Sequence, residues 1–412
     1  MFGNVARSRL LPLSVPFRYF GAAAAFQLAA WLVLLSFSGE VLKFELGLGP
    51  VFAALHLVTL GVLAMSAIGA TLQLLPVATR QPVRALWAVK LLWWLLVPGI
   101  GLFAWAGATY RPLAMGPGAM LVVLALVIYG VLLGKNLLGA RGMKTVVAHG
   151  WAALGCLVGL AATGLLIVGR YEHGWALDHL ALRNAHFVLA SFGFMGLMAL
   201  GLSGFLLPML AVAPPPPPRF TYLALSLAVA AIGAASFGFV VPGALLGLAA
   251  AIVHVASMER SLRARLRPAL GGSFALVRVS WACLIASLAL AALGFPGGPV
   301  LFGMLVVPGW LLTFLLGVLQ RIAPFLASVH AGGAAVSALT PARLLGAHRS
   351  LHLLALALLL AAVLSGEKAL AALGAACGLA GAALFAAFYV FILLKVRHGI
   401  HPPHQPAAAR GA

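Results

Sequence analysis

The segment from His56 to Pro76, HLVTLGVLAMSAIGATLQLLP, contains no Asp, Glu, Lys or Arg and is long enough to cross a membrane as one helix. It also carries a pattern that recurs twice. Pro76, Pro208 and Pro324 each follow one glycine by fifteen residues and a second glycine by seven. The pairs are Gly61 and Gly69, Gly193 and Gly201, and Gly309 and Gly317. Glycine is common here (47 of 412 residues), but six glycines at two fixed offsets indicate a threefold internal repeat.

The composition places most of the chain inside a membrane. Hydrophobic residues make up 64% of the sequence and charged residues only 8%, whereas a soluble domain carries about 25% charged residues. Continuous apolar runs predict an all-α, polytopic membrane protein rather than a β-barrel. Twelve runs are bounded by charges or by Pro and Gly clusters: 20–37, 52–77, 86–106, 119–138, 146–168, 187–210, 222–240, 241–258, 274–293, 301–326, 351–364 and 369–394. The eighth and eleventh are short, and bilayer thinning or burial in protein would accommodate them.

The basic residues predict the orientation. Sorted by alternate loops, 21 of the 26 Lys and Arg fall on the side of the N-terminus, and five of the six acids fall on the opposite side. Because basic loops stay in the cytoplasm, both termini are predicted to be cytoplasmic. The net charge of +20 therefore reflects membrane topology and contact with lipid, not nucleic-acid binding. The expected location is the bacterial cytoplasmic (inner) membrane.

The repeat predicts one membrane domain over residues 1–412. We expect three four-helix arcs, at about 17–140, 141–260 and 270–396, around a pseudo-threefold axis normal to the membrane. Residues 397–412 are predicted to form a disordered cytoplasmic tail.

Two histidines lie in the outer parts of repeat-related spans, where an ionisable side chain is costly and usually functional. His56 precedes its repeat proline by twenty residues and His186 by twenty-two. Two positions correspond to about 200° around a helix, so the imidazoles would face each other if spans two and six are neighbours. Facing imidazoles can ligate a b-type haem on both faces or begin a copper site. The alternative is two separate histidines that hydrogen-bond to carbonyls or water.

Other polar residues are weaker candidates, each with a plainer interpretation. Met304 could be a thioether ligand or a packing residue. Arg170 and Arg183, in the polar outer segment, could pair with haem propionates or dock a donor protein, or could simply be solvated. On the inner side, His149 and His352 begin spans five and eleven, where a second haem or copper could bind; hydrogen bonding at the interface is the alternative. The remaining inner-side histidines are His254, His330 and His348.

Catalytic motifs are missing from the sequence, so no catalytic residue is predicted. It has no Walker loop, HExxH or GxSxG motif, and no CxxCH for covalent haem attachment. All six acids fall in loops or at span ends, which argues against an ion-coupled transporter with a buried carboxylate.

Twelve spans, a threefold arrangement and histidines in spans two and six resemble the haem-copper oxidase subunit I superfamily. The text from His56 to Pro76 resembles the related NnrS family of haem- and copper-containing membrane proteins. The resemblance implies that His56 matches the family's span-two histidine and that His186 matches a metal-ligand histidine in span six. The chain departs from these families in lacking a tandem His-His in span seven, a His-x-His in span ten and a His-Ala-His-Glu-Met pattern. This implies a divergent relative with one haem or one metal site.

The sequence therefore favours a membrane haem protein that works in electron transfer or nitric oxide handling, which is compatible with an oxidoreductase. Its expected partners are a redox donor protein or quinol, and it could form a homo-oligomer. A permease or metal-handling protein without redox chemistry, and an accessory subunit of a respiratory complex, are the alternatives.

Overall fold

The structure is a computed structural model that describes residues 10–45, 47–295, 298–331 and 335–398. These residues form helices joined by short loops, and twelve of the helices are long and apolar enough to cross a membrane. The predicted fold class is therefore confirmed. Most of the predicted tail, from residue 399 onward, lies outside the described residues.

The spans follow one another in the chain in three sets of four. The first set is α2 (Ser14–Ser36), α4–η1–α5 (Pro50–His56, Leu57–Ala64 and Met65–Thr79), α6 (Leu86–Ala108) and α7 (Pro112–Leu138). The second set is α8 (Lys144–His173), α9–η2–α10 (His179–Val188, Leu189–Gly196 and Leu197–Ala211), α11 (Pro218–Ser236) and α12 (Val240–Arg263). The third set is α13 (Gly272–Ala292), α14–η3–α15 (Gly298–Met304, Leu305–Leu312 and Thr313–His330), α16 (Ala342–Ser365) and α17 (Lys368–Arg397). Two single-turn helices, α3 (Ser38–Val41) and η4 (Val336–Leu339), lie in loops.

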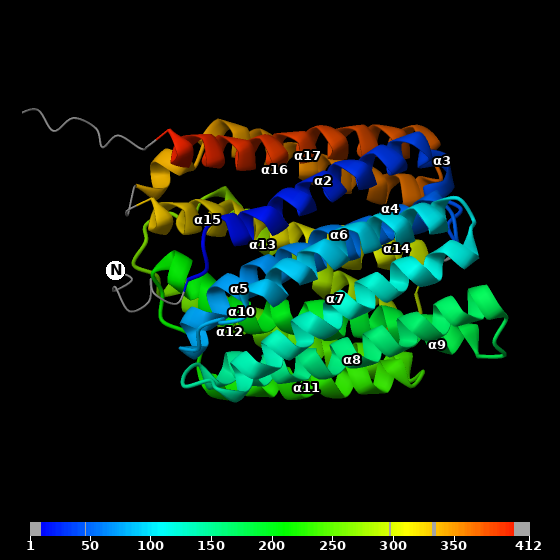
Figure 1. Cartoon of the computed structure of the whole chain (residues 1–412), viewed down its shortest axis with the longest axis horizontal. Coiled ribbons are helices and arrows are strands. Elements are labelled where there is room, and N and C mark those ends of the chain that lie inside the picture. The colour runs from blue at the N-terminus through cyan, green and yellow to red at the C-terminus, as the bar shows by residue number, and fades with distance from the viewer. Residues whose placement is uncertain (1–9, 46, 296–297, 332–334, 399–412) are drawn as a thin grey trace, which may run out of the picture.

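The helices run along the long axis of one bundle (Figure 1). The described chain begins and ends at the same end of this bundle, and we call that end inner and the opposite end outer. Helices α16 and α17 pack on each other, and α17 packs on α2, so the third set closes against the first.

The spans predicted to be short have ordinary lengths. Helices α12 and α16 each contain 24 residues, although their apolar runs are shorter. Helix α12 continues through Arg260 and Arg263, and α16 begins before Arg343 and Arg349. A helix does not end at its first charge, because a long arginine side chain can reach the interface while its backbone stays helical. No thinning of the bilayer is needed for these two spans.

The repeat glycines are points of close packing between neighbouring spans. A Cβ on Gly69 would meet Tyr19 on α2, and one on Gly61 would meet Phe26, seven residues further along the same helix. The same spacing recurs in the other sets, where Gly201 and Gly193 meet His149 and Cys156, and Gly317 and Gly309 meet Leu276 and Cys283. The shared register is what a threefold repeat predicts.

Each repeat span contains a π-helical segment in its outer half, a feature that sequence reasoning did not predict. Segments η1, η2 and η3 begin at Leu57, Leu189 and Leu305, each nineteen residues before the repeat proline. Runs of π-helix are rare and often occur at functional sites. Segment η3 packs against both η1 and η2, while η1 and η2 are the least closely packed pair. The gap between η1 and η2 is the one where the facing histidines were predicted.

Candidate functional site

His56 ends α4, directly before η1. Pro50 begins α4 after Gly49, whose φ of +136° is accessible to glycine and strained for other residues. The centroid of the imidazole lies 4.1 Å from that of the Phe52 ring and 5.2 Å from that of Phe103 on α6. Its Nδ1 lies 2.9 Å from the carbonyl oxygen of Phe52. Because a carbonyl only accepts, Nδ1 donates its proton there and Nε2 keeps its lone pair.

His186 lies on α9, three residues before η2, and faces α8. Gly164 on α8 gives the ring room, since a Cβ there would lie 3.1 Å from its Cε1. The Nδ1 of His186 lies 3.3 Å from Oγ1 of Thr163. That hydroxyl donates to the carbonyl of Gly159 at 2.8 Å, so it accepts from the imidazole, and the backbone carbonyl of Leu160 is a second acceptor for the ring. The Nε2 of His186 is therefore also left as the nitrogen with the lone pair.

The structure places these two histidines near each other but not in contact. They lie within electrostatic range of each other, yet no ring contact or hydrogen bond joins them in the part of the chain that the structure describes. Each imidazole has Nδ1 held by a second group, which is how proteins fix the orientation and tautomer of histidines that bind metals through Nε2.

The donor set suits a haem better than an ion held by protein alone. Zinc sites use three or four protein ligands. Among the described residues, no group of three or more His, Cys, Asp or Glu is placed to hold a metal ion. Two imidazoles with available Nε2 lone pairs are donors of the kind that would hold a b-type haem, because the porphyrin supplies the remaining donors to the iron. The donor chemistry of the two imidazoles is therefore compatible with this cofactor.

The two outer arginines have different roles in the structure. Nη1 of Arg170 donates to the carbonyls of Trp175, at 3.2 Å, and Leu177, at 2.7 Å, and so closes the loop between α8 and α9. Arg183 lies on α9 three residues before His186, on the same side of the helix and nearer its outer end. The position of Arg183 on α9 is therefore compatible with its predicted role beside His186.

Met304 ends α14 and packs against a hydrophobic cluster formed by α2, α16 and α17, which includes Trp31 and Leu359. These contacts favour the packing role over a thioether ligand.

The inner histidines His149 and His254 are held by hydrogen bonds on either side of α10. Nδ1 of His149 lies 2.8 Å from the carbonyl of Thr145, and Nε2 of His254 lies 3.2 Å from Oγ of Ser203. The two imidazoles are within electrostatic range of each other. These hydrogen bonds are the kind expected from the alternative interpretation, in which the inner histidines form hydrogen bonds and do not ligate a haem or copper.

His352 does not begin its span as predicted, because α16 starts ten residues earlier, before the apolar run. Its Nε2 lies 2.8 Å from Oγ1 of Thr313, and its ring stacks on that of His348 with centroids 6.2 Å apart. No contact joins His352 to His149 among the described residues. His330 is in neither pair, since its two ring nitrogens lie 2.8 Å from the carbonyl oxygen of Leu326 and 2.9 Å from that of Leu11. The inner histidines thus form two separate pairs and one single histidine rather than one site.

Comparison with known proteins adds no relative: no family model matches the chain, and no curated protein is significantly similar to it. The resemblance to the haem-copper oxidase and NnrS families stays a prediction.

Sequence reasoning missed the residues that hold the histidine pair. Phe52 could have been found, since it precedes His56 by four residues and so shares its helix face. Phe103 and Thr163 come from other spans, and nothing in their own surroundings distinguishes them from the many apolar and hydroxyl residues of this chain.

Proposed function

We propose that the chain is a membrane redox protein in which His56 and His186 hold a b-type haem from its two faces. The supporting observation is the pair itself: two imidazoles from different repeats lie within electrostatic range, each with Nδ1 held and Nε2 available. When bound, such a haem supplies one-electron iron chemistry, which serves electron transfer or nitric oxide handling.

The surrounding residues would orient the ligands and keep water away. Phe52 and Phe103 pack on the His56 ring and fix its plane. The carbonyl of Phe52 and the hydroxyl of Thr163 take the Nδ1 protons, which raises the basicity of each Nε2. Arg183 would pair with a cofactor carboxylate at the outer end of α9.

The wider setting is part of the same proposal. The chain would reside in the bacterial cytoplasmic membrane with its termini in the cytoplasm and the histidine pair in the outer half. A donor protein at the loop between α8 and α9, or a quinol in the bilayer, would supply electrons. Self-association, or assembly into a respiratory complex, is compatible with the lipid-facing apolar side chains of the outer helices.

The test is purification of the full chain from haem-replete cells, followed by a reduced-minus-oxidised absorption spectrum and metal analysis. We expect a b-type haem spectrum with iron equimolar to the chain. Both signals should be lost in His56→Ala and in His186→Ala. They should be retained in His173→Ala, which removes a histidine whose side chain is 57% exposed.

Other outcomes would overturn the haem assignment. A purified protein that contains copper but no haem would show that the histidine pair binds copper instead of haem. A wild-type protein that contains neither haem nor metal, with solute flux in vesicles, would favour the permease alternative.

A further inference from the structure

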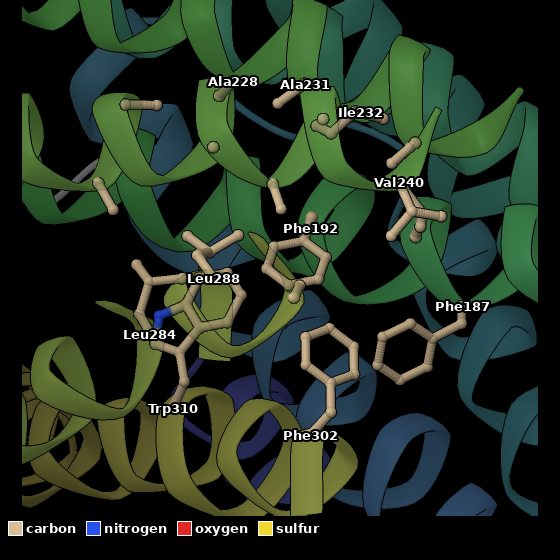
Figure 2. A pocket seen from close by; sticks show the side chains of 18 of the residues that line it. Phe187, Phe192, Ala228, Ala231, Ile232, Val240, Leu284, Leu288, Phe302 and Trp310 are labelled. Carbon is tan, nitrogen blue, oxygen red and sulfur yellow. The ribbon is translucent and has the colours of Figure 1, made fainter. Parts of the chain in front are cut away.

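Two features lie away from the histidine pair. The first is an apolar pocket between α9, α11, α12 and η3, where the rings of Phe187, Phe302 and Trp310 lie across from Ala228 and Ala231 on α11 (Figure 2). The pocket is partly open, and none of the described residues that line it is charged, so nothing in it selects one occupant. The second feature is a group of three arginines at the inner end of the bundle, which we call the arginine cluster: Arg267, Arg321 and Arg349.

The arginine cluster comes from three segments that meet at the beginning of α13. Arg267 lies in the loop between α12 and α13, Arg321 on α15 and Arg349 on α16. A Cβ on Gly271 would lie 2.6 Å from Nη2 of Arg321, and a Cβ on Gly272 would overlap the guanidinium of Arg349. Two guanidinium groups thus lie against consecutive glycines at the start of α13, and a side chain at either glycine would have to displace one of them.

No carboxylate neutralises these charges in the part of the chain that the structure describes. Arg321 is within electrostatic range of both Arg267 and Arg349. All six acids are described, and Glu259 is the one of them at the inner end. It accepts from Nε of Arg278 at 2.6 Å and from Nη2 at 3.0 Å, so it is already paired. The N-terminus of α13 adds positive partial charge at the same place. Because partly buried like charges repel one another, a bound anion would stabilise the cluster.

The cluster also has N–H groups available for an anion. A guanidinium carries five N–H donors. Arg321 donates to Oγ of Ser273 at 2.8 Å and to the carbonyl of Leu270, and Arg267 donates to a carbonyl of α10 at 2.9 Å. Arg349 has no hydrogen-bond acceptor among the described residues. Each arginine therefore has donors left over, and a phosphate group accepts from several guanidinium N–H groups at once.

The depth of the cluster indicates that the anion belongs to a lipid. Arg321 lies within the apolar run 301–326, nine residues before the end of α15, which is about 14 Å from the helix end. Arg349 lies seven residues after the beginning of α16, or about 10 Å. Gly271 and Arg267 are exposed, so the cluster can be reached from the surface of the bundle. Lipid headgroups lie where apolar spans end, and basic pockets between spans at this level bind anionic headgroups.

We infer that the arginine cluster binds the phosphate group of an anionic phospholipid between α13, α15 and α16. The inference is drawn from these charges and contacts alone and does not depend on haem binding by His56 and His186.

The experiment is native mass spectrometry of the full chain in a neutral detergent, titrated with phosphatidylglycerol, with phosphatidylcholine of the same acyl chains, and with inorganic phosphate. We expect one phosphatidylglycerol per chain, bound about tenfold more tightly than phosphatidylcholine, which has a phosphate but no net charge. Inorganic phosphate at the same concentration should not displace it. Arg349→Gln should weaken phosphatidylglycerol binding about tenfold, because it removes charged donors to the phosphate.

The matched control is Arg343→Gln, because Arg343 is exposed on the same helix, six residues before Arg349, and the change removes the same charge. It should bind phosphatidylglycerol as the wild type does. Arg267→Gln gives the same test should Arg349→Gln fail to fold. The proposal is overturned if the wild type binds both lipids equally, or if inorganic phosphate displaces the lipid, which would indicate a site for a free anion. It is also overturned if Arg349→Gln and Arg267→Gln fold and bind as tightly as the wild type, or if Arg343→Gln loses as much affinity as they do.

Discussion

The hydroxyl of Thr71 on α5 lies 2.9 Å from the hydroxyl of Tyr129 on α7, and an equivalent bond recurs in the second repeat. Ser203, like Thr71, precedes its repeat proline by five residues, and its Oγ lies 3.2 Å from Nε2 of His254 on α12. Tyr129 and His254 each lie nine residues before the last residue of their helix. In the first two sets, a hydroxyl group on the second span thus forms a hydrogen bond with an aromatic side chain on the fourth span.

The third repeat has a tyrosine within one residue of the corresponding place on its last span, but no hydroxyl at the corresponding position of the repeat span. Leu319 occupies the position five residues before Pro324. Tyr389 lies eight residues before the end of α17, and its buried hydroxyl has no hydrogen-bond partner among the described residues. A buried polar group without a partner costs about 1–3 kcal/mol of stability. The repeat pattern therefore points to position 319 as the place where a hydroxyl could supply a partner for Tyr389.

The first prediction is that a hydroxyl at position 319 stabilises the protein through Tyr389. We compare Leu319→Thr with Leu319→Val, because Thr and Val have nearly the same shape and differ in the hydroxyl. Leu319→Thr should be the more stable of the two by about 1 kcal/mol. Unfolding of the purified protein in detergent, followed by circular dichroism, measures the difference. The Tyr389→Phe background should abolish it, and a Val variant at least as stable as the Thr variant would contradict the prediction.

The sequence predicted the number of spans and the repeat because both depend on local patterns. Apolar runs separated by charges are readable one span at a time, and the glycine and proline offsets survive as fixed spacings. The ends of the helices were less predictable. Helix α7 begins at Pro112 rather than near Ala119. Pro112 takes the first helical position, where proline is favoured, and the helix continues through Pro117 although this residue has no N–H to donate to the preceding turn.

The π-helical segments and the surroundings of the histidines could not be predicted. A π segment differs from an α-helix in hydrogen-bond register, and a run such as Leu57–Ala64 is as apolar as any α-helical run in this chain. The pairing of Thr163 with His186, and of Thr313 with His352, depends on how separate spans pack. Periodicity within one span contains no information on such contacts.

The second prediction concerns close packing at Gly201. A Cβ on Gly201 would lie 2.5 Å from Cβ of His149 on α8, which is too short for any real contact. Gly201→Ala should therefore destabilise the protein by about 1–3 kcal/mol, because α8 and α10 must move apart. Gly204→Ala, on the same helix, has nothing within 4 Å of the added Cβ and should be neutral or stabilising, since alanine favours a helix over glycine. Thermal unfolding of both variants checks the difference, and equal effects would refute the packing argument.

The third prediction concerns the hydroxyl that holds His186. Thr163→Val removes one hydrogen-bond partner of the His186 imidazole and leaves the backbone carbonyl of Leu160 as the other, so the orientation of the ring is less firmly fixed. We expect haem affinity to fall by about 10- to 100-fold, as measured by competition with a haem-binding protein, and the reduction potential to shift. Thr59→Val is the control, since the Thr59 hydroxyl bonds only the Leu55 carbonyl of its own span at 2.9 Å. Equal losses in both variants would indicate a general effect on folding instead.

The last prediction tests the orientation of the bundle. Phe237, 85% exposed, follows α11 at the predicted outer end, and Leu266, 81% exposed, follows α12 at the predicted inner end. In a chain whose Cys156, Cys283 and Cys377 are replaced by alanine, each position is changed to cysteine in turn. Intact cells are then treated with a membrane-impermeant maleimide. Phe237→Cys should be labelled in intact cells and Leu266→Cys only after lysis, because the arginines that flank Leu266 stay on the cytoplasmic side.

The reverse labelling pattern would place both termini outside the cell and the histidine pair in the cytoplasmic half of the membrane. Labelling of both positions in intact cells would contradict an odd number of membrane crossings between them. Helix α12 is the one span between these two positions, so this pair of variants also tests the span whose apolar run is only 18 residues long in the sequence. Its 24-residue helix ends in Arg260 and Arg263, and a crossing by this helix requires that these two side chains extend to the inner interface.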